Sequence, residues 1–340
     1  MLESDHNDES GLAGPPITDR SRFAETAPRL WAARRTLCYA PMMSSSFALW
    51  RDRRGRVSAL RVAVLTFLAL PVALAAHAFL TAGLGARPIN DLIHRTGYWA
   101  LVFLLVSLAV TPLARVGRLN GLIDVRRMLG VGTCVYAVTH ILLFVADQMF
   151  DLLKVATEIV LRLYLTIGFI ALLGLVALAV TSTDAMVRRL GSRRWQRLHQ
   201  LVYGIALLVL IHFFQQTKAD IWVPTFAAGL FVWLMGYRLM MRWRRGAPSA
   251  LALLLLAVIA SALVFAGEAI GIALYYKVSP LLVLQSTFDF DLDMIRPAWL
   301  VLGAGLCVVV LQVVQSRRQK PARPTAKPAP ARAVQAEEVA

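Results

Sequence analysis

Charged residues are scarce in this chain of 340 residues, and cysteine is scarcer still. Only 16% of the residues are charged, whereas a soluble globular domain has about a quarter. Because 58% of the residues are hydrophobic, the composition argues against a water-soluble enzyme. The three cysteines form no CxxC pair and show no metal-type spacing. Neither a disulfide framework nor a thiolate metal site is therefore expected.

Acidic residues are also in short supply. The chain has 20 Asp and Glu against 36 Lys and Arg, which gives a formal charge of +16. Such an excess suits nucleic-acid binding when the basic residues gather on a soluble surface. It suits membrane topology when they lie in alternate loops. The positions of the charges decide between these two explanations.

Eight stretches of the chain contain no Asp, Glu, Lys or Arg. Each has between 17 and 25 residues, and a helix needs about 20 apolar residues to cross the hydrocarbon core of a bilayer. The stretches are residues 62–86, 96–114, 128–146, 163–183, 198–217, 221–237, 246–267 and 297–316. We predict an all-α membrane protein with eight transmembrane helices, the seventh continuing past Glu268 to about Leu274.

Arginine marks every second loop between these stretches. Arginine-rich segments lie at residues 51–61, 115–127, 188–197 and 238–245 and after residue 316, whereas the loops between them carry few basic residues. Basic loops stay on the cytoplasmic side of a membrane. We therefore predict a multi-pass membrane protein with both termini in the cytoplasm. Its charge reflects topology in a lipid membrane, and we expect no nucleic-acid partner.

Composition divides the chain into four parts. Residues 1–56 form a basic N-terminal tail without a signal-peptide pattern, and disorder is expected there. Residues 57–245 form a six-helix domain, and residues 246–316 form an additional transmembrane hairpin. Residues 317–340, rich in Pro, Ala and Lys, are predicted to be a disordered tail. The pair Met42 and Met43 suggests that translation starts there.

Histidines are the notable polar residues of the predicted spans. His140 and His212 both fall in the outer half of the membrane, on different helices. His199 lies near the cytoplasmic face, about 20 Å along the axis from His212, so these two cannot share a small metal ion. His94 comes just before the second predicted helix. His77 has a comparable depth in the first helix without a companion motif, so we interpret it as a packing residue.

Two histidines at matched depth on different helices suit the axial positions of a b-type haem. The alternative is that they only form hydrogen bonds between helices. Arg162 lies at the outer end of the fourth span, either to pair with a haem propionate or as an interfacial arginine. Glu268 is either a proton carrier or a residue at the membrane interface, and the latter is favoured.

Several motifs occur in the same order as in a known family. Residues 83–97 (GLGARPINDLIHRTG) resemble the first periplasmic loop of the MsrQ (YedZ) family. The other matching segments are 111–115 (TPLAR), 126–130 (RRMLG), 164–168 (YLTIG), 181–183 (TST), 189–191 (RLG) and 195–199 (WQRLH), followed by Tyr203 and His212. The resemblance covers about residues 57–245.

The resemblance implies a six-helix, ferric-reductase-like domain that holds haem b through His140, His199 and His212. It also implies an FMN and electrons drawn from the quinone pool or from a cytosolic flavin reductase. The electrons pass to MsrP, a periplasmic molybdopterin enzyme that reduces methionine sulfoxide in oxidised proteins. This chain departs from the family at Leu163, where proline is usual, and its last two helices have no counterpart.

The roles of the remaining candidate residues stay open. His199 either ligates a second haem with an unusual partner or stands near a flavin or quinone. Arg126 and Arg127 either bind a flavin phosphate or serve topology alone. His94 is a candidate contact for a quinone or for the partner protein at the outer surface.

Other function classes compete with an electron-transfer subunit. A stand-alone ferric-reductase-like or quinone-linked cytochrome b is the first alternative, although the chain offers no long soluble segment for an NADPH or FAD domain. A membrane transporter or scaffold is the second, and the sequence shows no internal repeat of the kind many transporters have.

Overall fold

The computed structural model describes residues 49–51, 55–81, 83, 85–217, 220–244, 248–286 and 295–318. The chain divides into two units, Met1–Arg56 and Val57–Ala340, and all the helices below belong to the second. Met42, Met43 and nearly all of the two predicted tails lie outside the described residues.

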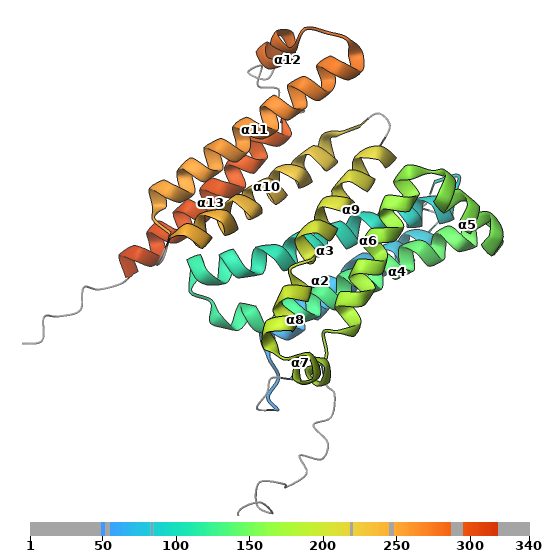
Figure 1. The fold of residues 1–340 in the computed structure, drawn as a ribbon, viewed down its shortest axis with the longest axis horizontal. Helices are drawn as coiled ribbons and strands as arrows, with labels where there is room; N and C mark the ends of the chain where they lie inside the picture. The colour runs from blue at the N-terminus through green and yellow to red at the C-terminus, as the bar shows by residue number, and fades with distance from the viewer. Residues whose placement is uncertain are drawn as a thin grey trace, which may run out of the picture. The chain divides into compact units, whose positions relative to one another are not determined.

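The described part of the chain is built from helices and contains no strand (Figure 1). In chain order the helices are α2 (Ala59–Leu80), α3 (Pro88–Gly117), the 3-10 helix η1 (Asn120–Val125), α4 (Arg126–Asp147), α5 (Leu152–Leu161), α6 (Leu163–Val180), α7 (Asp184–Leu190), α8 (Ser192–His199), α9 (Val202–Gln216), α10 (Trp222–Trp243), α11 (Ala250–Tyr276), α12 (Pro280–Ser286) and α13 (Pro297–Arg318).

Eight helical segments of the described residues are long and apolar enough to cross a membrane. They are α2, α3, η1 with α4, α6, α8 with α9, α10, α11 and α13. Each coincides with one of the eight charge-free stretches, so the predicted all-α membrane fold is confirmed. α11 ends at Tyr276, close to the predicted end near Leu274.

Two boundaries differ from the prediction in ways that matter for the histidines. α3 begins at Pro88, so His94 lies inside this helix rather than before it. The prediction used only charge-free residues. It therefore began this helix after Asp91 and Arg95 and left out its first turns. The fifth span is interrupted after His199, which ends α8, whereas His212 belongs to α9.

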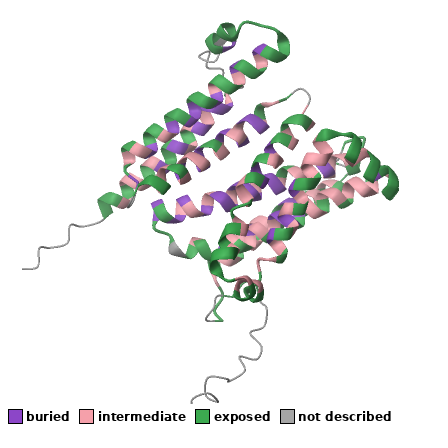
Figure 2. Cartoon of the chain, viewed as in Figure 1, coloured by how far each residue is buried: buried purple, intermediate pink, exposed green. Residues whose placement is uncertain are grey.

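α3 lies at the centre of the described helices. Two thirds of its apolar segment is buried, against 6% for α2, and α3 packs against α4, α9, α10 and α13. Figure 2 shows the buried residues gathered on the inner helix faces and exposed residues along the outer faces. Many exposed side chains on the spans are large and apolar, such as Leu70, Leu173 and Leu255. This suits helices surrounded by lipid.

The last two spans continue the packing of the first six. α11 and α13 lie side by side and both contact α10, while α13 also reaches α3 (Figure 1). A Cβ on Gly305 would lie 2.5 Å from the Cβ of Ala257, so the missing side chain lets α13 approach α11 closely. The Ser261 hydroxyl also donates to the Ala298 carbonyl at 2.9 Å.

α5 was not predicted. Asp151 begins it by accepting a hydrogen bond from the Lys154 amide at 2.9 Å. Its strongly amphipathic sequence buries Val155 and leaves Leu153 and Leu161 exposed, which is typical of a helix lying in a membrane interface.

Candidate functional site

A cavity of about 430 Å³ opens between α3, α4, α6 and α9. Its volume is in the range of small-molecule and cofactor sites. Most of its wall is apolar, and the apolar lining includes Ile93, Leu101, Ala137, Ile141, Leu165, Phe169, Leu172 and Val209. Such a wall keeps water away from whatever the cavity holds.

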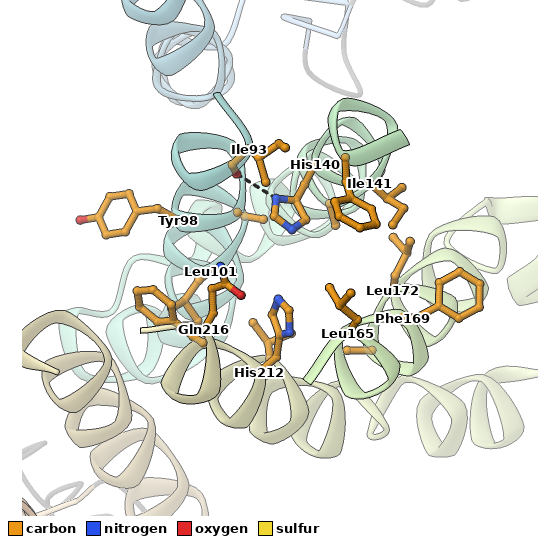
Figure 3. Close-up of a pocket in the computed structure, with 18 of the residues that line it drawn as sticks. Ile93, Tyr98, Leu101, His140, Ile141, Leu165, Phe169, Leu172, His212 and Gln216 are labelled. Atoms are coloured by element: carbon orange, nitrogen blue, oxygen red, sulfur yellow. Dashed lines mark hydrogen bonds between the residues drawn. The ribbon is translucent and has the colours of Figure 1, made fainter. Parts of the chain in front are cut away.

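His140 from α4 and His212 from α9 point toward one another across this cavity (Figure 3). Their ring centroids are 6.4 Å apart, and the ring planes are inclined by 81°. The structure thus brings together the two histidines that the sequence placed at matched depth.

Each of these imidazoles is held by a backbone carbonyl of a facing helix. The Nδ1 atom of His140 is 2.8 Å from the Ile93 carbonyl oxygen, and the Nδ1 atom of His212 is 2.7 Å from that of Tyr164. A carbonyl only accepts hydrogen bonds, so each Nδ1 carries the proton. In a neutral imidazole, Nε2 then keeps a lone pair that can bind a metal.

A glycine lies beneath each ring, four residues after the carbonyl that holds it. A Cβ on Gly97 would lie 3.0 Å from the Nδ1 atom of His140, and a Cβ on Gly168 would lie 2.8 Å from the Nδ1 atom of His212. The distance at Gly168 is shorter than real Cβ contacts, and the distance at Gly97 is tighter than nearly all of them, so glycine lets both rings pack closely here. Ile93 with Gly97, and Tyr164 with Gly168, form the same cradle twice.

Polar residues gather at one end of the cavity, where α3 begins and where α4 and α9 end. They are Asn90, His94, Asp147, Gln216 and Thr217. His94 therefore lines the same cavity as the histidine pair, whereas the sequence analysis expected it at the outer surface. Among the described residues, no group of three or more His, Cys, Asp and Glu side chains could hold a metal ion. Two facing imidazoles remain as the candidate ligands.

His199 lies apart from this cavity, because it is not one of the lining residues. Its Nε2 atom is 3.2 Å from the Ser182 hydroxyl, and its Nδ1 atom is 3.1 Å from the Trp195 carbonyl. The ring also stacks on Trp195 with centroids 3.9 Å apart. Both ring nitrogens thus have polar neighbours.

The arginines singled out from the sequence also lie outside the cavity lining. Arg162 precedes α6, and its contact with the Tyr164 hydroxyl, together with its pairing with Glu158, raises the pKa of its guanidinium. Arg127 pairs with Asp184 at 2.6 Å on an exposed surface. His77 is exposed on α2 and is likewise absent from the cavity wall.

Comparison with known proteins identifies the family. Residues 96–211 match the family described as ferric reductase like transmembrane component. The chain is 41% identical over 196 residues to a protein of Rhodospirillum rubrum, which covers 92% of that protein and 57% of this chain. That relative is named protein-methionine-sulfoxide reductase heme-binding subunit MsrQ. The chain belongs to the MsrQ family.

Further MsrQ relatives agree. One from Ralstonia nicotianae is 38% identical over 203 residues, covering 91% of that protein and 59% of this chain. One from Xanthomonas campestris pv. campestris is 45% identical over 163 residues, covering 73% of that protein and 48% of this chain. No solved structure matches the chain. The ferric-reductase match includes His140 and His199, ends one residue before His212 and leaves out α10 to α13.

Proposed function

We propose that this chain is the haem b electron-transfer subunit of a protein-methionine-sulfoxide reductase system, with His140 and His212 as the two residues that would hold one haem iron. The observation that carries the proposal is the spacing of their rings. A metal–imidazole bond is about 2.0 Å, and the bonding nitrogen is about 1.1 Å from its ring centre, so two axial imidazoles have centroids about 6.2 Å apart. The 6.4 Å between His140 and His212 fits that arrangement.

The residues around the pair fit a haem as well. The carbonyls of Ile93 and Tyr164 keep Nδ1 protonated, which presents Nε2 and makes it a better donor. The apolar lining excludes water from the ring faces, as expected of a low-polarity haem pocket. When bound, haem supplies one-electron chemistry at its iron.

The direction of transfer follows from the alternating arginine loops. They support cytoplasmic termini and an inner-membrane location. In that orientation the polar end of the cavity faces the periplasm, since Asn90, Asp147 and Thr217 lie at the outer ends of their helices. We assign the acceptor as an MsrP-like periplasmic molybdopterin reductase, in keeping with the names of the relatives. His94, at the same end, is assigned to contact with this partner or with a quinone.

The donor side is assigned to a quinol or a cytosolic flavin reductase, with FMN as a further cofactor. Arg126 and Arg127 begin α4 and His199 ends α8, at the opposite end of the spans from the polar end of the cavity, so these three are our candidates for a flavin phosphate site or a second haem. The haem-to-protein ratio of His199→Ala separates these roles: a loss of half the haem assigns His199 to a second haem. Arg162 remains our candidate for a propionate contact, for which it would have to leave Glu158.

The deciding experiment is a reduced-minus-oxidised absorption spectrum of the purified membrane protein. We expect a b-type haem spectrum in the wild type and in His77→Ala, whose histidine lies outside the cavity. We expect it to be lost or strongly reduced in His140→Ala and in His212→Ala. A spectrum unchanged by both cavity variants would refute the ligand pair.

The match to ferric-reductase-like domains favours one second candidate, a stand-alone cytochrome b that reduces other acceptors. Reoxidation of the dithionite-reduced protein separates the two functions. A periplasmic molybdopterin reductase should speed reoxidation in the first case and leave it unchanged in the second.

A further inference from the structure

Arg238 is an arginine within a membrane span, five residues before α10 ends at Trp243. Its side chain turns back toward the middle of the span. The Nη1 atom donates to the Leu234 carbonyl at 2.9 Å, and the Nη2 atom donates to the Leu108 carbonyl of α3 at 2.6 Å. The guanidinium also lies over the Tyr203 ring of α9, 5.0 Å from its centroid. Arg238 therefore connects three helices of the bundle (Figure 1).

Part of this arrangement is structural. In a regular helix the Leu108 carbonyl would accept a hydrogen bond from residue 112, but that residue is Pro112, which has no N–H. Arg238 supplies the missing hydrogen bond to a residue that is completely buried. A neutral side-chain amide could donate to this carbonyl as well. The need for a hydrogen bond therefore does not explain why the donor carries a charge.

The positive charge of Arg238 has no carboxylate beside it. None of the ion pairs between described residues includes Arg238. The helices that it contacts contain one acidic residue, Asp91, which lies 17 residues before Leu108 in the first turn of α3. Leu108 is itself nine residues from the end of α3, so the charge lies roughly 13 Å inside the span. An unpaired charge at such a depth is costly and commonly marks a functional residue.

The charge lies between the two levels of histidines. On one side, Leu108 follows Leu104 by one turn of α3, and Leu104 lines the histidine cavity. On the other side, Tyr203 follows His199 by four residues where α8 gives way to α9. Arg238 thus lies between the proposed haem cavity and the cytoplasmic end of the bundle, to which the electron donor is assigned.

The distance to the histidine pair sets the size of the electrostatic effect. Gly97 packs against the His140 ring, and Leu108 lies 11 residues further along α3, which is ~16 Å along the axis. At an effective dielectric constant of about 20, a unit charge at that distance changes by about fivefold an equilibrium that adds one charge. Arg238 is therefore near enough to influence the reduction of a metal held by the two histidines.

We propose that Arg238 serves as a fixed positive charge that raises the reduction potential of the haem assigned to His140 and His212. The inference rests on the proposed function, because it requires a haem in the histidine cavity. Reduction takes one electron from the donor, which is oxidised, and adds one negative charge at the ferric iron. Arg238 stabilises that added charge without touching the cofactor and without moving a proton. It thereby favours the entry of electrons from the cytoplasmic side.

An anaerobic redox titration of the full chain in lipid nanodiscs, followed by haem absorption, measures this effect. Arg238→Gln removes the charge and keeps side-chain N–H donors. We expect the equilibrium constant for haem reduction to fall by about fivefold, which lowers the midpoint potential by about 40 mV. Arg238→Lys keeps the charge, and we expect it to stay within about twofold of the wild type even though it loses contacts.

Arg242→Gln is the matched control. Arg242 lies one turn further along α10 and is exposed, so its charge is screened by water and salt. We expect its equilibrium constant for reduction to stay within about twofold of the wild type. If Arg238→Gln does not fold, the comparison is made in a Pro112→Ala background, where residue 112 regains its N–H and the Leu108 carbonyl no longer depends on Arg238.

Three outcomes would overturn the inference. The first is an unchanged potential in Arg238→Gln. The second is an equal fall in Arg238→Gln and Arg238→Lys, because both variants alter the contacts but only one loses the charge. The third is an equal fall in Arg242→Gln, which would indicate a general effect of surface charge. The absorption spectrum keeps the two proposals apart. Its absence from the wild type would refute the proposed function, whereas a haem whose potential ignores Arg238 would refute only this inference.

Discussion

Gly168→Ala tests whether the His212 ring must sit where the structure places it. An alanine Cβ would lie 2.8 Å from Nδ1, while ordinary contacts begin at 3.4 Å, so the ring has to retreat by about 0.6 Å. Metal–ligand bonds tolerate about 0.2 Å. The retreat would also stretch the 2.7 Å hydrogen bond to the Tyr164 carbonyl. Changes to such supporting contacts cost about 10–100-fold in metal affinity, and we expect a haem loss of that order.

The assay is the haem-to-protein ratio of purified protein during titration with a competing apo-haemoprotein. Gly204→Ala is the control, since Gly204 is on α9 with His212 and a Cβ there meets no atom within 4 Å. It should bind haem like the wild type. If Gly168→Ala and Gly204→Ala retain haem equally, the cradle does not position the ligand and the reasoning about the site is wrong.

Three other predictions concern parts of the molecule away from the histidine pair. Arg238→Lys should lower the free energy of unfolding by roughly 1.5–3 kcal/mol, because the guanidinium donates to the carbonyls of Leu108 at 2.6 Å and Leu234 at 2.9 Å; thermal denaturation in detergent measures this, and an unchanged melting temperature would contradict it. Arg127→Ala should change stability by less than about 1 kcal/mol, since its partner Asp184 is exposed; a large loss of melting temperature would show that the pair is structural. A C-terminal fusion to green fluorescent protein should fluoresce and one to alkaline phosphatase should be inactive, as a cytoplasmic terminus requires; the reverse pattern would invert the proposed direction of electron transfer.

The eight spans were predictable because charge is so costly in hydrocarbon that its absence marks each helix. The same logic placed His140 and His212 at one depth, and the structure brings their ring centroids to within 6.4 Å. It failed at the ends of spans, where charges are tolerated. At those ends the prediction left out the first turns of α3 and did not identify α5. The amphipathic sequence of α5 is typical of a helix lying in a membrane interface rather than spanning the membrane.

The hydrogen bonds that hold the two histidine rings could not be predicted from the sequence, for a different reason. Ile93 and His140 are 47 residues apart in the chain, and Tyr164 and His212 are 48 apart. No local pattern links such pairs. The sequence analysis noted Gly97 and Gly168 only as parts of family motifs. A glycine four residues after the residue whose carbonyl holds the ring is, however, a pattern that could indicate where a histidine of a facing helix packs. The pairing of Glu268 with Arg296 likewise depends on how α11 and α13 pack.

Electron paramagnetic resonance of the oxidised protein tests the central claim most directly, because it reports the axial ligands of the iron. Two imidazoles that held an iron with their planes inclined by 81° would leave two of its d orbitals close in energy. The account therefore predicts a low-spin, strongly anisotropic signal with one large g value, lost in His140→Ala and in His212→Ala. A high-spin signal in the wild type, or a low-spin signal that survives in both variants, would contradict it.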